Sequence, residues 1–453
     1  MSINQSSNDY LTDGPISTME MDQTHNKESM LRRITVAASV GSLIEYFDLA
    51  VYGAFASVMA KVFFPGADDT ADLLNTFAVF AVAFVARPLG GLFWGPLGDR
   101  IGRKRTLAAI IIIMALATAA IGLLPSHAAI GTLAPLALVV LRFVQGISAG
   151  GEIPGAATFV AEHTHTNKRA LQTSFLMWGV SIGQLAGLLV ATVLFSVLSA
   201  EDMQSWGWRV PFLLGLPLGA IGLYIRSRVS ESPEFLKVEQ TVAKANPLKA
   251  ILGNAQGLRM LGKALLFTLP MAFTGYMLLT YMPAYLTKSL HLTSGDALLA
   301  VSAAMIVAMI LQPVAGRLSD RIGRRRMLLT VCLTELALAL PAFALLQSGH
   351  GDGGALLPSL GLILLGVVHG AGTGTQSAPT LESFPTRYRY TGFALALGLV
   401  AALLSGPTPY IATWLVAATG NGYAPAWLLM ASVIPPIIGF FFIKETANRP
   451  LPS

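Results

Sequence analysis

The chain has 453 residues, of which 54% are hydrophobic and only 12% are charged. Soluble domains carry roughly 25% charged residues, so this composition excludes an ordinary soluble protein and indicates a chain embedded in lipid. The net charge of +6 does not indicate nucleic-acid binding, because the Lys and Arg residues form short clusters between long apolar runs. The single cysteine, Cys332, excludes an intrachain disulfide and a cysteine-based metal site.

Apolar runs of about 20 residues, long enough to cross a bilayer, follow a polar first segment. Residues 1–33 lack an apolar core and are predicted to form a disordered cytoplasmic tail instead of a signal peptide. Twelve apolar runs follow, at 34–60, 72–97, 106–124, 132–161, 169–199, 209–227, 261–287, 296–318, 327–346, 355–383, 390–418 and 422–443. The sequence therefore predicts an all-α integral membrane protein with twelve transmembrane helices. Its expected parts are two pseudo-symmetric six-helix halves (34–227 and 261–443), a cytoplasmic linker (228–260) and a cytoplasmic tail (444–453).

A ten-residue motif occurs once in each half. Residues 95–104 read GPLGDRIGRK, and residues 316–325 read GRLSDRIGRR. Duplication at about half the chain length in an apolar sequence is typical of transporters. A carboxylate beside cations or at a helix N-terminus can pair in one conformation and separate in another. We therefore expect a conformational latch that includes Gly95, Asp99, Arg100, Gly102, Arg103, Asp320, Arg321, Gly323 and Arg324.

An acid followed seven residues later by a base also occurs in both halves. Glu162 precedes Arg169 after the fourth run, and Glu382 precedes Arg389 after the tenth. These four residues are predicted to complete the latch with the aspartates of the duplicated motif. The alternative is that these loop charges only set the membrane topology.

The distribution of positive charge predicts the orientation. Of the 30 Lys and Arg residues, 25 lie in the two tails and in the loops on the same side as the tails, whereas Lys61, Arg209 and Lys288 lie on the other side. Positively charged loops stay in the cytoplasm. We therefore expect a multi-pass protein of the bacterial inner membrane with both termini in the cytoplasm.

Ionisable residues inside the apolar runs cost free energy and are candidates for function. Glu45 and Asp48 lie three residues apart and share a helix face, so one of the two carboxylates is expected to bind a proton readily. A buried ion pair with Arg87 or Arg142 is the alternative. Glu152, ten residues after Arg142, completes the predicted proton-coupling set of Glu45, Asp48 and Glu152.

The predicted substrate-binding residues combine cations with aromatic and polar side chains. A guanidinium binds a carboxylate through two hydrogen bonds, which suits Arg142 to a substrate carboxylate. Aromatic rings suit a quaternary ammonium group. The predicted set is Arg142, Arg87, Tyr52, Tyr276, Thr280 and His369. Glu335, in the ninth run, has no assigned role.

The duplicated motif resembles the loop signature of the major facilitator superfamily. IEYFD at 44–48, RPLGG at 87–91, QG at 145–146 with GGE at 150–152, and WGWRVPF at 206–212 are similar to its metabolite:proton symporter branch. YMLLTYMP at 276–283 and KETANRPL at 444–451 look most like the proline/glycine betaine symporters of that branch. Those symporters carry a long C-terminal coiled-coil extension. This sequence has no such heptads before Ser453, so osmotic gating of that kind is not expected.

The resemblance implies a proton-coupled secondary transporter that imports a small zwitterion, such as proline or glycine betaine, by alternating access. A proton symporter of a carboxylic acid such as citrate, 2-oxoglutarate or shikimate is the alternative, because Arg87 and Arg142 supply two cations. A drug/proton antiporter fits less well. No phosphate-binding G-x-x-x-x-G-K-[ST] loop occurs, and no enzyme activity is expected. The expected partners are the substrate, protons and the bilayer, with no cofactor, metal or nucleic acid, and with a functional monomer.

Overall fold

The computed structural model describes residues 42–66, 68–101, 103–227, 247–348, 354–386 and 389–452. The predicted tail 1–33, most of the predicted linker and Gly102 lie outside these residues. The side chains of residues 95–104 and of Glu162 also lie outside the described part of the structure. Within the described ranges the chain is helical and contains no strand.

The helices fall into two sets, which we call the N-terminal half (residues 42–227) and the C-terminal half (residues 247–443). The N-terminal half contains Ser42–Ala54, α2 (Ala56–Phe63), α3 (Asp69–Ile101), α4 (Arg103–Leu123), α5 (His127–Ile130), α6 (Leu133–Ala149), α7 (Glu152–His163), α8 (Arg169–Val197), α9 (Ala200–Asp202), α10 (Arg209–Leu213) and α11 (Gly215–Ser227). The C-terminal half contains α13 (Pro247–Leu252), α14 (Ala255–Thr268), α15 (Pro270–Tyr276), α16 (Met282–Ser289), α17 (Ser294–Ile322), α18 (Arg324–Gln347), α19 (Leu356–Leu381), α20 (Arg389–Val400), α21 (Thr408–Thr419) and α22 (Ala424–Phe442). Turns of π-helix lie at Met203–Gly207, Met277–Tyr281 and Ala401–Ser405, and a 3₁₀ turn lies at Thr166–Lys168.

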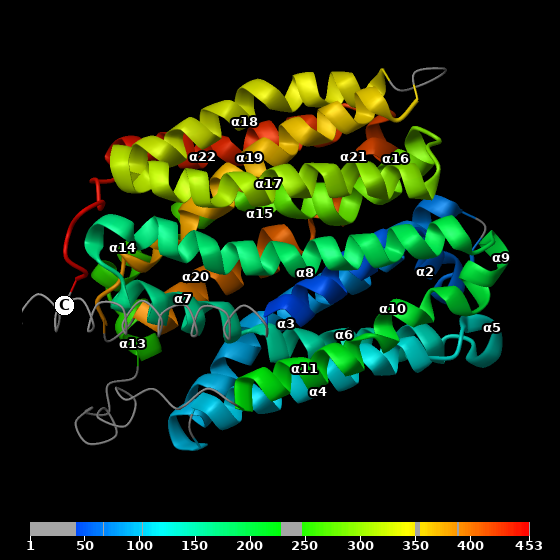
Figure 1. Ribbon diagram of the computed structural model, residues 1–453, viewed down its shortest axis with the longest axis horizontal. Helices are drawn as coiled ribbons and strands as arrows, with labels where there is room; N and C mark the ends of the chain where they lie inside the picture. Colours follow the sequence, from blue (N-terminus) through cyan, green and yellow to red (C-terminus); the bar gives the residue numbers. More distant parts are fainter. Residues whose placement is uncertain are drawn as a thin grey trace, which may run out of the picture.

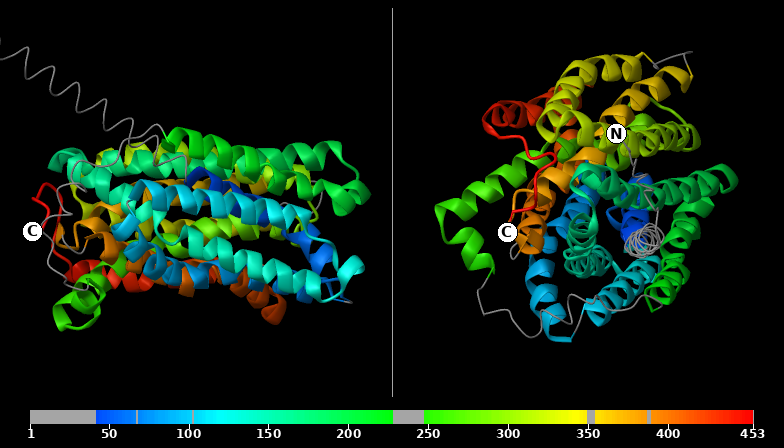
Figure 2. Two further views of the ribbon diagram at one scale, coloured as in Figure 1. Left: turned by 90° about the horizontal axis from the view of Figure 1, so that it is seen from below. Right: turned by 60° about the vertical axis from the view of Figure 1, so that its left-hand side comes forward.

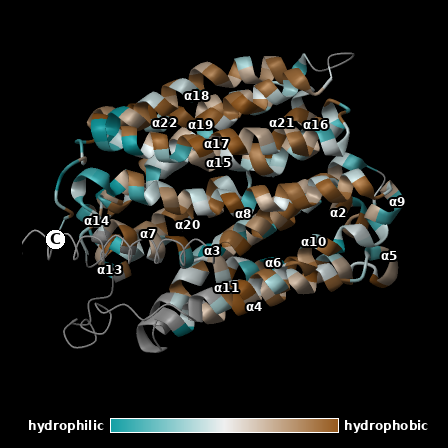
Figure 3. Cartoon of the chain, in the orientation of Figure 1, coloured by the Kyte–Doolittle hydropathy of each residue, from teal (hydrophilic) through white to brown (hydrophobic). Residues whose placement is uncertain are grey.

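The predicted spans appear as helices. In the described ranges, nine helical segments are long and apolar enough to cross a membrane, and the pair Ser42–Ala54 and Ala56–Phe63, bent by 70°, makes a tenth. The two remaining predicted spans are occupied by α4 and by α10 with α11. Figure 3 shows apolar residues along the length of the helices and hydrophilic residues at both ends. This pattern is the one that a bilayer requires of a helical bundle.

The last part of the predicted linker is helical. Residues 247–260 contain α13 and the beginning of α14. Asn254 caps α14, because its side chain accepts a hydrogen bond from the Gly257 N–H at 2.8 Å. Lys249 and Arg259 make this stretch polar, which is why the apolar pattern did not reveal the helices.

The helices run lengthwise beside one another, as Figures 1 and 2 show. One end of the bundle carries the duplicated motif, at the junctions of α3 with α4 and of α17 with α18, and we call it the motif end. The C-terminus lies at this end, on the left in Figure 1. The other end, which carries α2, α5, α9 and α16, is called the distal end.

The two halves contact each other along their length. α8 packs against α17 and α19, and α3 packs against α20 and α21. Near the middle, a Cβ atom at Gly53 would lie only 2.7 Å from Thr280 Cα, so this approach of two backbones requires glycine. At the distal end, Lys288 Nζ donates a hydrogen bond to the Asp69 carbonyl at 2.8 Å. The halves therefore touch at the distal end as well as at the motif end, where α8 meets α17.

Candidate functional site

Arginine is prominent among the largest fully buried side chains of the described residues. At most 2% of the surface is exposed in each of four arginines, which are Arg142, Arg169, Arg324 and Arg389. Taking an isolated charge out of water costs several kcal/mol, so a buried guanidinium needs carboxylates or other acceptors around it. These arginines mark two clusters, one inside the N-terminal half and one at the motif end.

The central cluster is built on Arg142 of α6. Arg142 Nη1 lies 2.5 Å from Asp48 Oδ2 and donates to Gln145 Oε1 at 2.9 Å. Gln145 Nε2 in turn donates to Asp48 Oδ1 at 3.2 Å and to Thr118 Oγ1 at 2.8 Å. Three segments of the N-terminal half thus position one buried ion pair, and the glutamine holds both partners.

One edge of the buried Arg142 guanidinium has no hydrogen-bond partner among the described residues. Its Nη1 atom serves Asp48 and Gln145, but Nε and Nη2 have no hydrogen-bond partner among the described residues. The Tyr52 ring covers one face, with its centroid 4.0 Å from Arg142 Cζ, and the Tyr52 hydroxyl donates to the Thr76 carbonyl at 2.9 Å. Nε and one Nη form the edge that binds a carboxylate through two parallel hydrogen bonds.

A second ion pair lies at the boundary between the halves. Arg87 Nη2 of α3 lies 2.6 Å from Glu45 Oε1, and the Arg87 Cζ atom lies 4.3 Å from the centroid of the Phe84 ring. Tyr46 and Tyr276 lie beside the same guanidinium. The Tyr276 ring, which comes from the C-terminal half, meets Phe84 edge to face at 5.0 Å. This pair therefore faces both halves.

Glu45 and Asp48 each face their own guanidinium. We expected one carboxylate to raise the proton affinity of the other, and this expectation did not include the two arginines. In the present conformation, both acids form buried ion pairs, as the alternative described. α3 and α6 bring Arg87 and Arg142 to the helix face that carries both acids, so the cations offset the repulsion between the carboxylates. The role of these acids in proton coupling stays a prediction.

A π-helical turn at Met277–Tyr281 separates α15 from α16. Tyr276 ends α15 immediately before the turn, and Thr280 lies within it. The Thr280 hydroxyl is buried and has no hydrogen-bond partner among the described residues. π-Turns are frequent at functional sites, and this one places Thr280 against Gly53 of the other half.

Glu152 and His369 lie on other elements. Glu152 is buried and begins α7, after the break that separates α7 from α6 and from Arg142. The carbonyl of Gly151, the residue before it, accepts a hydrogen bond from the Tyr390 hydroxyl of α20 at 2.9 Å. His369 of α19 packs against α15, since a Cβ atom at Gly275 would lie 2.8 Å from its Cε1 atom. Glu152 thus lies near the boundary between the halves, and His369 contacts the helix that carries Tyr276.

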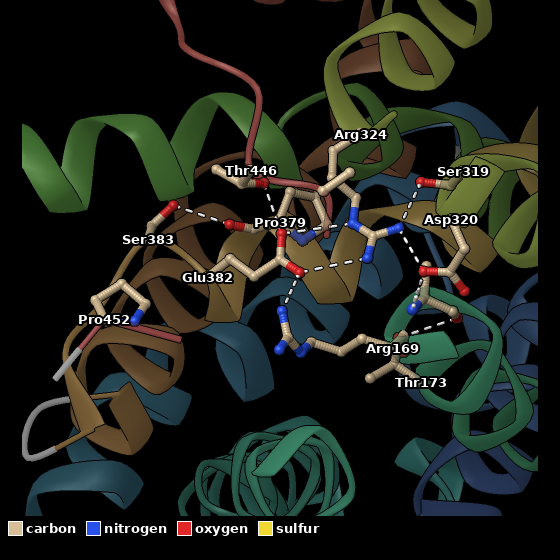
Figure 4. Close-up of polar contacts among 12 residues, drawn as sticks. Arg169, Thr173, Ser319, Asp320, Arg324, Pro379, Glu382, Ser383, Thr446 and Pro452 are labelled. Carbon is tan, nitrogen blue, oxygen red and sulfur yellow. Dashed lines mark hydrogen bonds and ion pairs between the residues drawn. The ribbon is translucent and has the colours of Figure 1, made fainter. Parts of the chain in front are cut away.

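The cluster at the motif end joins the two halves through charged groups (Figure 4). Arg169 Nη1 of α8 lies 2.6 Å from Glu382 Oε1, and Arg324 Nη1 lies 2.7 Å from Asp320 Oδ1. Arg324 also reaches Glu382 at 3.4 Å. The Asp320 carboxylate accepts hydrogen bonds from the backbone N–H groups of Ala170 at 3.1 Å and Leu171 at 2.9 Å. A carboxylate of the C-terminal half therefore binds the N-terminus of a helix in the other half.

The segment after α22 binds the same cluster, and we call residues 444–452 the strap. Glu445 accepts hydrogen bonds from the backbone N–H groups of Arg324 at 2.8 Å and Arg325 at 3.1 Å, at the start of α18. Thr446 Oγ1 donates to Glu382 Oε2 at 2.6 Å. The Pro452 carbonyl accepts from the Thr386 N–H and from Arg389 Nη2, both at 3.1 Å.

Glu445 is half-buried, and its surroundings favour the ionised form. Burial alone would raise the pKa of this carboxyl group, but backbone N–H donors from Ala447, Arg324, Arg325 and Thr446 outweigh burial and lower it. The carboxylate thus acts as an anionic cap on α18.

The predicted latch residues have different environments. Arg169, Asp320, Arg324 and Glu382 come together, whereas Arg321 is exposed, so Arg324 is the base of the second motif that reaches the acids. Gly323, with φ of 105°, makes the single-residue turn between α17 and α18. Arg389 donates to Thr386 and to the strap. The side chains of the first motif, which include Asp99, Arg100 and Arg103, and that of Glu162 lie outside the described residues.

Several residues of both clusters were missed by sequence reasoning. Gln145 follows Arg142 by three residues, so a polar residue on the same helix face was an available signal. Thr118 and Glu445 gave no comparable signal, because the groups that they contact lie on other elements. The strap was predicted only as a tail.

Comparison with known proteins places these features in a family. The Major Facilitator Superfamily profile matches residues 38–409. The chain is 39% identical to the proline/betaine transporter of Salmonella typhimurium, over 95% of this chain and 87% of the relative. It is 40% identical to the glycine betaine/proline/ectoine/pipecolic acid transporter OusA of Dickeya dadantii, over 95% of this chain and 86% of the relative.

Solved structures show the same fold. The xylose transporter XylE from E. coli, in a partially occluded inward open conformation, superposes with a TM-score of 0.72 and 20% identity, over 93% of this chain and 100% of that chain. A XylE complex with 6-bromo-6-deoxy-D-glucose gives a TM-score of 0.71, over 94% of this chain and 98% of that chain. The predicted all-α, twelve-helix fold is confirmed, and the chain belongs to the Major Facilitator Superfamily.

Proposed function

We propose that the protein is a proton-coupled symporter that imports a small zwitterion, such as proline or glycine betaine, by alternating access. The relatives named above, with about 40% identity over nearly the whole chain, are transporters of proline, betaine and related zwitterions by name. The proposal places the protein in the bacterial inner membrane, with the motif end and both termini in the cytoplasm. It requires no cofactor other than the coupling proton, and a monomer suffices.

The balance of charge in the central cluster and in the Arg87–Glu45 pair carries the choice of substrate. Two guanidinium groups, of Arg87 and Arg142, face two carboxylates, of Glu45 and Asp48. With all four ionised, this site has no excess positive charge, which suits a zwitterion better than a dicarboxylate or tricarboxylate. A proton symporter of a carboxylic acid would need positively charged side chains that are not already paired with carboxylates of the protein.

Individual groups match the two ends of a zwitterion. The Nε and Nη2 edge of Arg142, which has no partner in the described part of the chain, suits the substrate carboxylate. The aromatic rings of Tyr52, Phe84 and Tyr276 suit its ammonium group, since cations are attracted to ring faces. Thr280 and His369 remain candidates on the side of the C-terminal half.

Protonation of an acid in the cluster supplies the coupling. When Asp48 binds a proton, its negative charge is lost, and Arg142 is free to pair with the substrate carboxylate instead. Glu45, paired with Arg87, and Glu152, beside the C-terminal half, are the other predicted proton-coupling acids. Substrate and proton then bind together, as symport requires.

Uptake into proteoliposomes with an imposed proton gradient tests this proposal. The purified chain should accumulate proline or glycine betaine, and collapse of the gradient should abolish the accumulation. Arg142→Lys should raise the KM for substrate by about tenfold or more, because lysine keeps the positive charge but cannot form two parallel hydrogen bonds with a carboxylate. Lys61→Arg, at an exposed position of α2 at the distal end, is the matched control and should behave like wild type. Accumulation of citrate-like acids alone would overturn the assignment.

A further inference from the structure

A buried carboxyl group lies in the C-terminal half, outside both clusters described above. Glu335 is about midway along α18 and has no exposed surface. Its Oε1 atom forms a hydrogen bond with the hydroxyl of Thr274 on α15, and Oε2 has no hydrogen-bond partner among the described residues. A carboxylate with one hydrogen bond and no cation is costly in a low-dielectric interior.

The charged and titratable groups on neighbouring helices do not compensate Glu335. α18 packs against α17, α19 and α22, and α22 contains no titratable residue. The others on these helices and on α15 are Asp296, Arg317, Asp320, Arg321, His369 and Tyr276, and on α18 itself Arg324, Arg325, Arg326 and Cys332. Among the described residues, none of these groups forms an ion pair with Glu335, and Cys332, three residues earlier, carries a thiol and no positive charge. No cation therefore holds this group in its ionised form.

The count of hydrogens around Thr274 agrees with a protonated Glu335. The Thr274 hydroxyl has one proton but two neighbouring acceptor positions, Glu335 Oε1 and the Pro270 carbonyl at 3.4 Å. If Glu335 is protonated, it donates to Thr274 Oγ1, and Thr274 donates to Pro270. Both contacts then carry a hydrogen, whereas with an ionised Glu335 the single Thr274 proton can serve only one of the two acceptors.

The Glu335–Thr274 contact is linked to the Arg87–Glu45 pair by the last residues of α15. Gly275, next to Thr274, packs against the ring of His369. Tyr276 follows and lies beside Arg87 and Phe84 in the other half. A change at Thr274 is thus two residues away from the contact between Tyr276 and the Arg87–Glu45 pair.

We propose that Glu335 is a second proton-carrying site of the transport cycle, located in the C-terminal half and linked to the Arg87–Glu45 pair through Thr274 and Tyr276. The protonated acid holds Thr274 and so fixes the last turn of α15 in the present conformation. Loss of the proton to water, when α15 and α18 separate, releases that turn. This role rests on the proposed proton coupling, whereas the protonation of Glu335 itself does not.

Glu335→Gln in the full-length, reconstituted protein is the decisive variant, because the amide is neutral and can still hydrogen-bond with Thr274. It should retain substrate exchange across the membrane, while gradient-driven accumulation falls at least tenfold. Asp296→Asn, which removes an acid at the distal end of α17, is the matched control and should accumulate substrate normally. Thr274→Val removes the hydroxyl without changing charge and should weaken the dependence of uptake on pH.

Infrared spectroscopy reports on the protonation state directly. The wild type at neutral pH should show a C=O stretching band of a protonated carboxyl group that is missing in Glu335→Gln. Identical bands in both proteins would overturn the proposal, as would normal accumulation by Glu335→Gln. If the wild type transports neither proline nor betaine, the proposed function fails, and the infrared comparison still decides whether Glu335 carries a proton.

Discussion

At the scale of single residues, the central feature is a set of arginines whose charges are matched inside the protein. Asp48 binds Arg142 and Glu45 binds Arg87, both in almost fully buried positions. Removing one partner of a buried ion pair typically costs about 3–5 kcal/mol, because the remaining charge is left without compensation. A proton on either acid removes its negative charge and also leaves the arginine without compensation. Protonation of these pairs therefore favours a change of structure.

Asp48→Asn tests this conversion. Asparagine resembles the protonated acid, so the variant should exchange substrate but should lose at least 90% of its gradient-driven accumulation, a tenfold effect that corresponds to about 1.4 kcal/mol. Radiolabelled uptake with and without a gradient provides the measurement. Thr192→Val, which removes a buried hydroxyl that is hydrogen-bonded to the Leu188 carbonyl of its own helix α8, is the control. Accumulation by Asp48→Asn at the wild-type level would exclude Asp48 from coupling.

At the scale of helices, the junction of α8 with α17 is a contact between a carboxylate and a helix N-terminus. Asp320 accepts hydrogen bonds from two backbone N–H groups at the start of α8, where the helix dipole favours negative charge. Arg324 holds Asp320 from its own side, and the strap holds α18. The junction therefore depends on elements from three parts of the sequence.

Asp320→Asn should favour opening of the motif end. Hydrogen bonds to a charged group contribute about 1.5–3 kcal/mol, and asparagine keeps one acceptor but loses the charge. We expect the open population to rise by roughly tenfold. The alkylation rate of Ser181→Cys, in a Cys332→Ser background, measures it, since Ser181 of α8 is buried against Gln312 of α17. Arg321→Gln, an exposed neighbour on α17, should leave the rate unchanged, and an unchanged rate in Asp320→Asn would contradict the prediction.

At the scale of the whole molecule, the strap connects the end of the chain to the junction between the halves. Its contacts reach the starts of α18 and α20 and the end of α19. All three elements belong to the C-terminal half, and Glu382, which Thr446 contacts, is also the partner of Arg169. Movement of the strap is thus expected to change how tightly the halves associate at the motif end.

Acid should release the strap. The pKa of Glu445 is lowered in the docked state, so its stabilising effect is present above the ordinary carboxyl pKa and is lost as the pH falls through the lowered value. A fluorophore on Arg449→Cys, in a Cys332→Ser background, should become mobile in that acidic range. Glu445→Gln should abolish this dependence on pH. An acid transition of the same midpoint in both proteins would show that another group is responsible.

The spans were predictable because lipid imposes a length and a polarity on every helix that crosses it. The duplicated motif also led to the motif end, where Asp320 and Arg324 meet. The pairing itself was not predictable, because Arg169 and Glu382 are 213 positions apart, and only the packing of α8 against α17 and α19 brings them together. Within the N-terminal half, a buried ion pair with Arg87 or Arg142 was the stated alternative, but the choice of Arg142 for Asp48, 94 positions away, required the packing of the helices.

The strap and Glu335 were missed for different reasons. The strap has no apolar or helical pattern, and its contacts use backbone groups that every sequence possesses. Glu335 was recognised as a charge in an apolar run, but its partner Thr274 is 61 positions away and is a neutral residue of a common type. Sequence periodicity describes which face of a helix is buried, and it does not specify what that face contacts.

The Asp320 contact has a consequence for mutational tolerance. Its two donors are backbone N–H groups of Ala170 and Leu171, which are present whatever side chains stand there. Sequence drift at these positions therefore leaves this half of the contact intact, and nearly all of its mutational sensitivity falls on Asp320. Proline is the exception, because it has no N–H group yet is tolerated in the first turn of a helix. Ala170→Pro is thus a way to delete one of these hydrogen bonds while the helix itself survives.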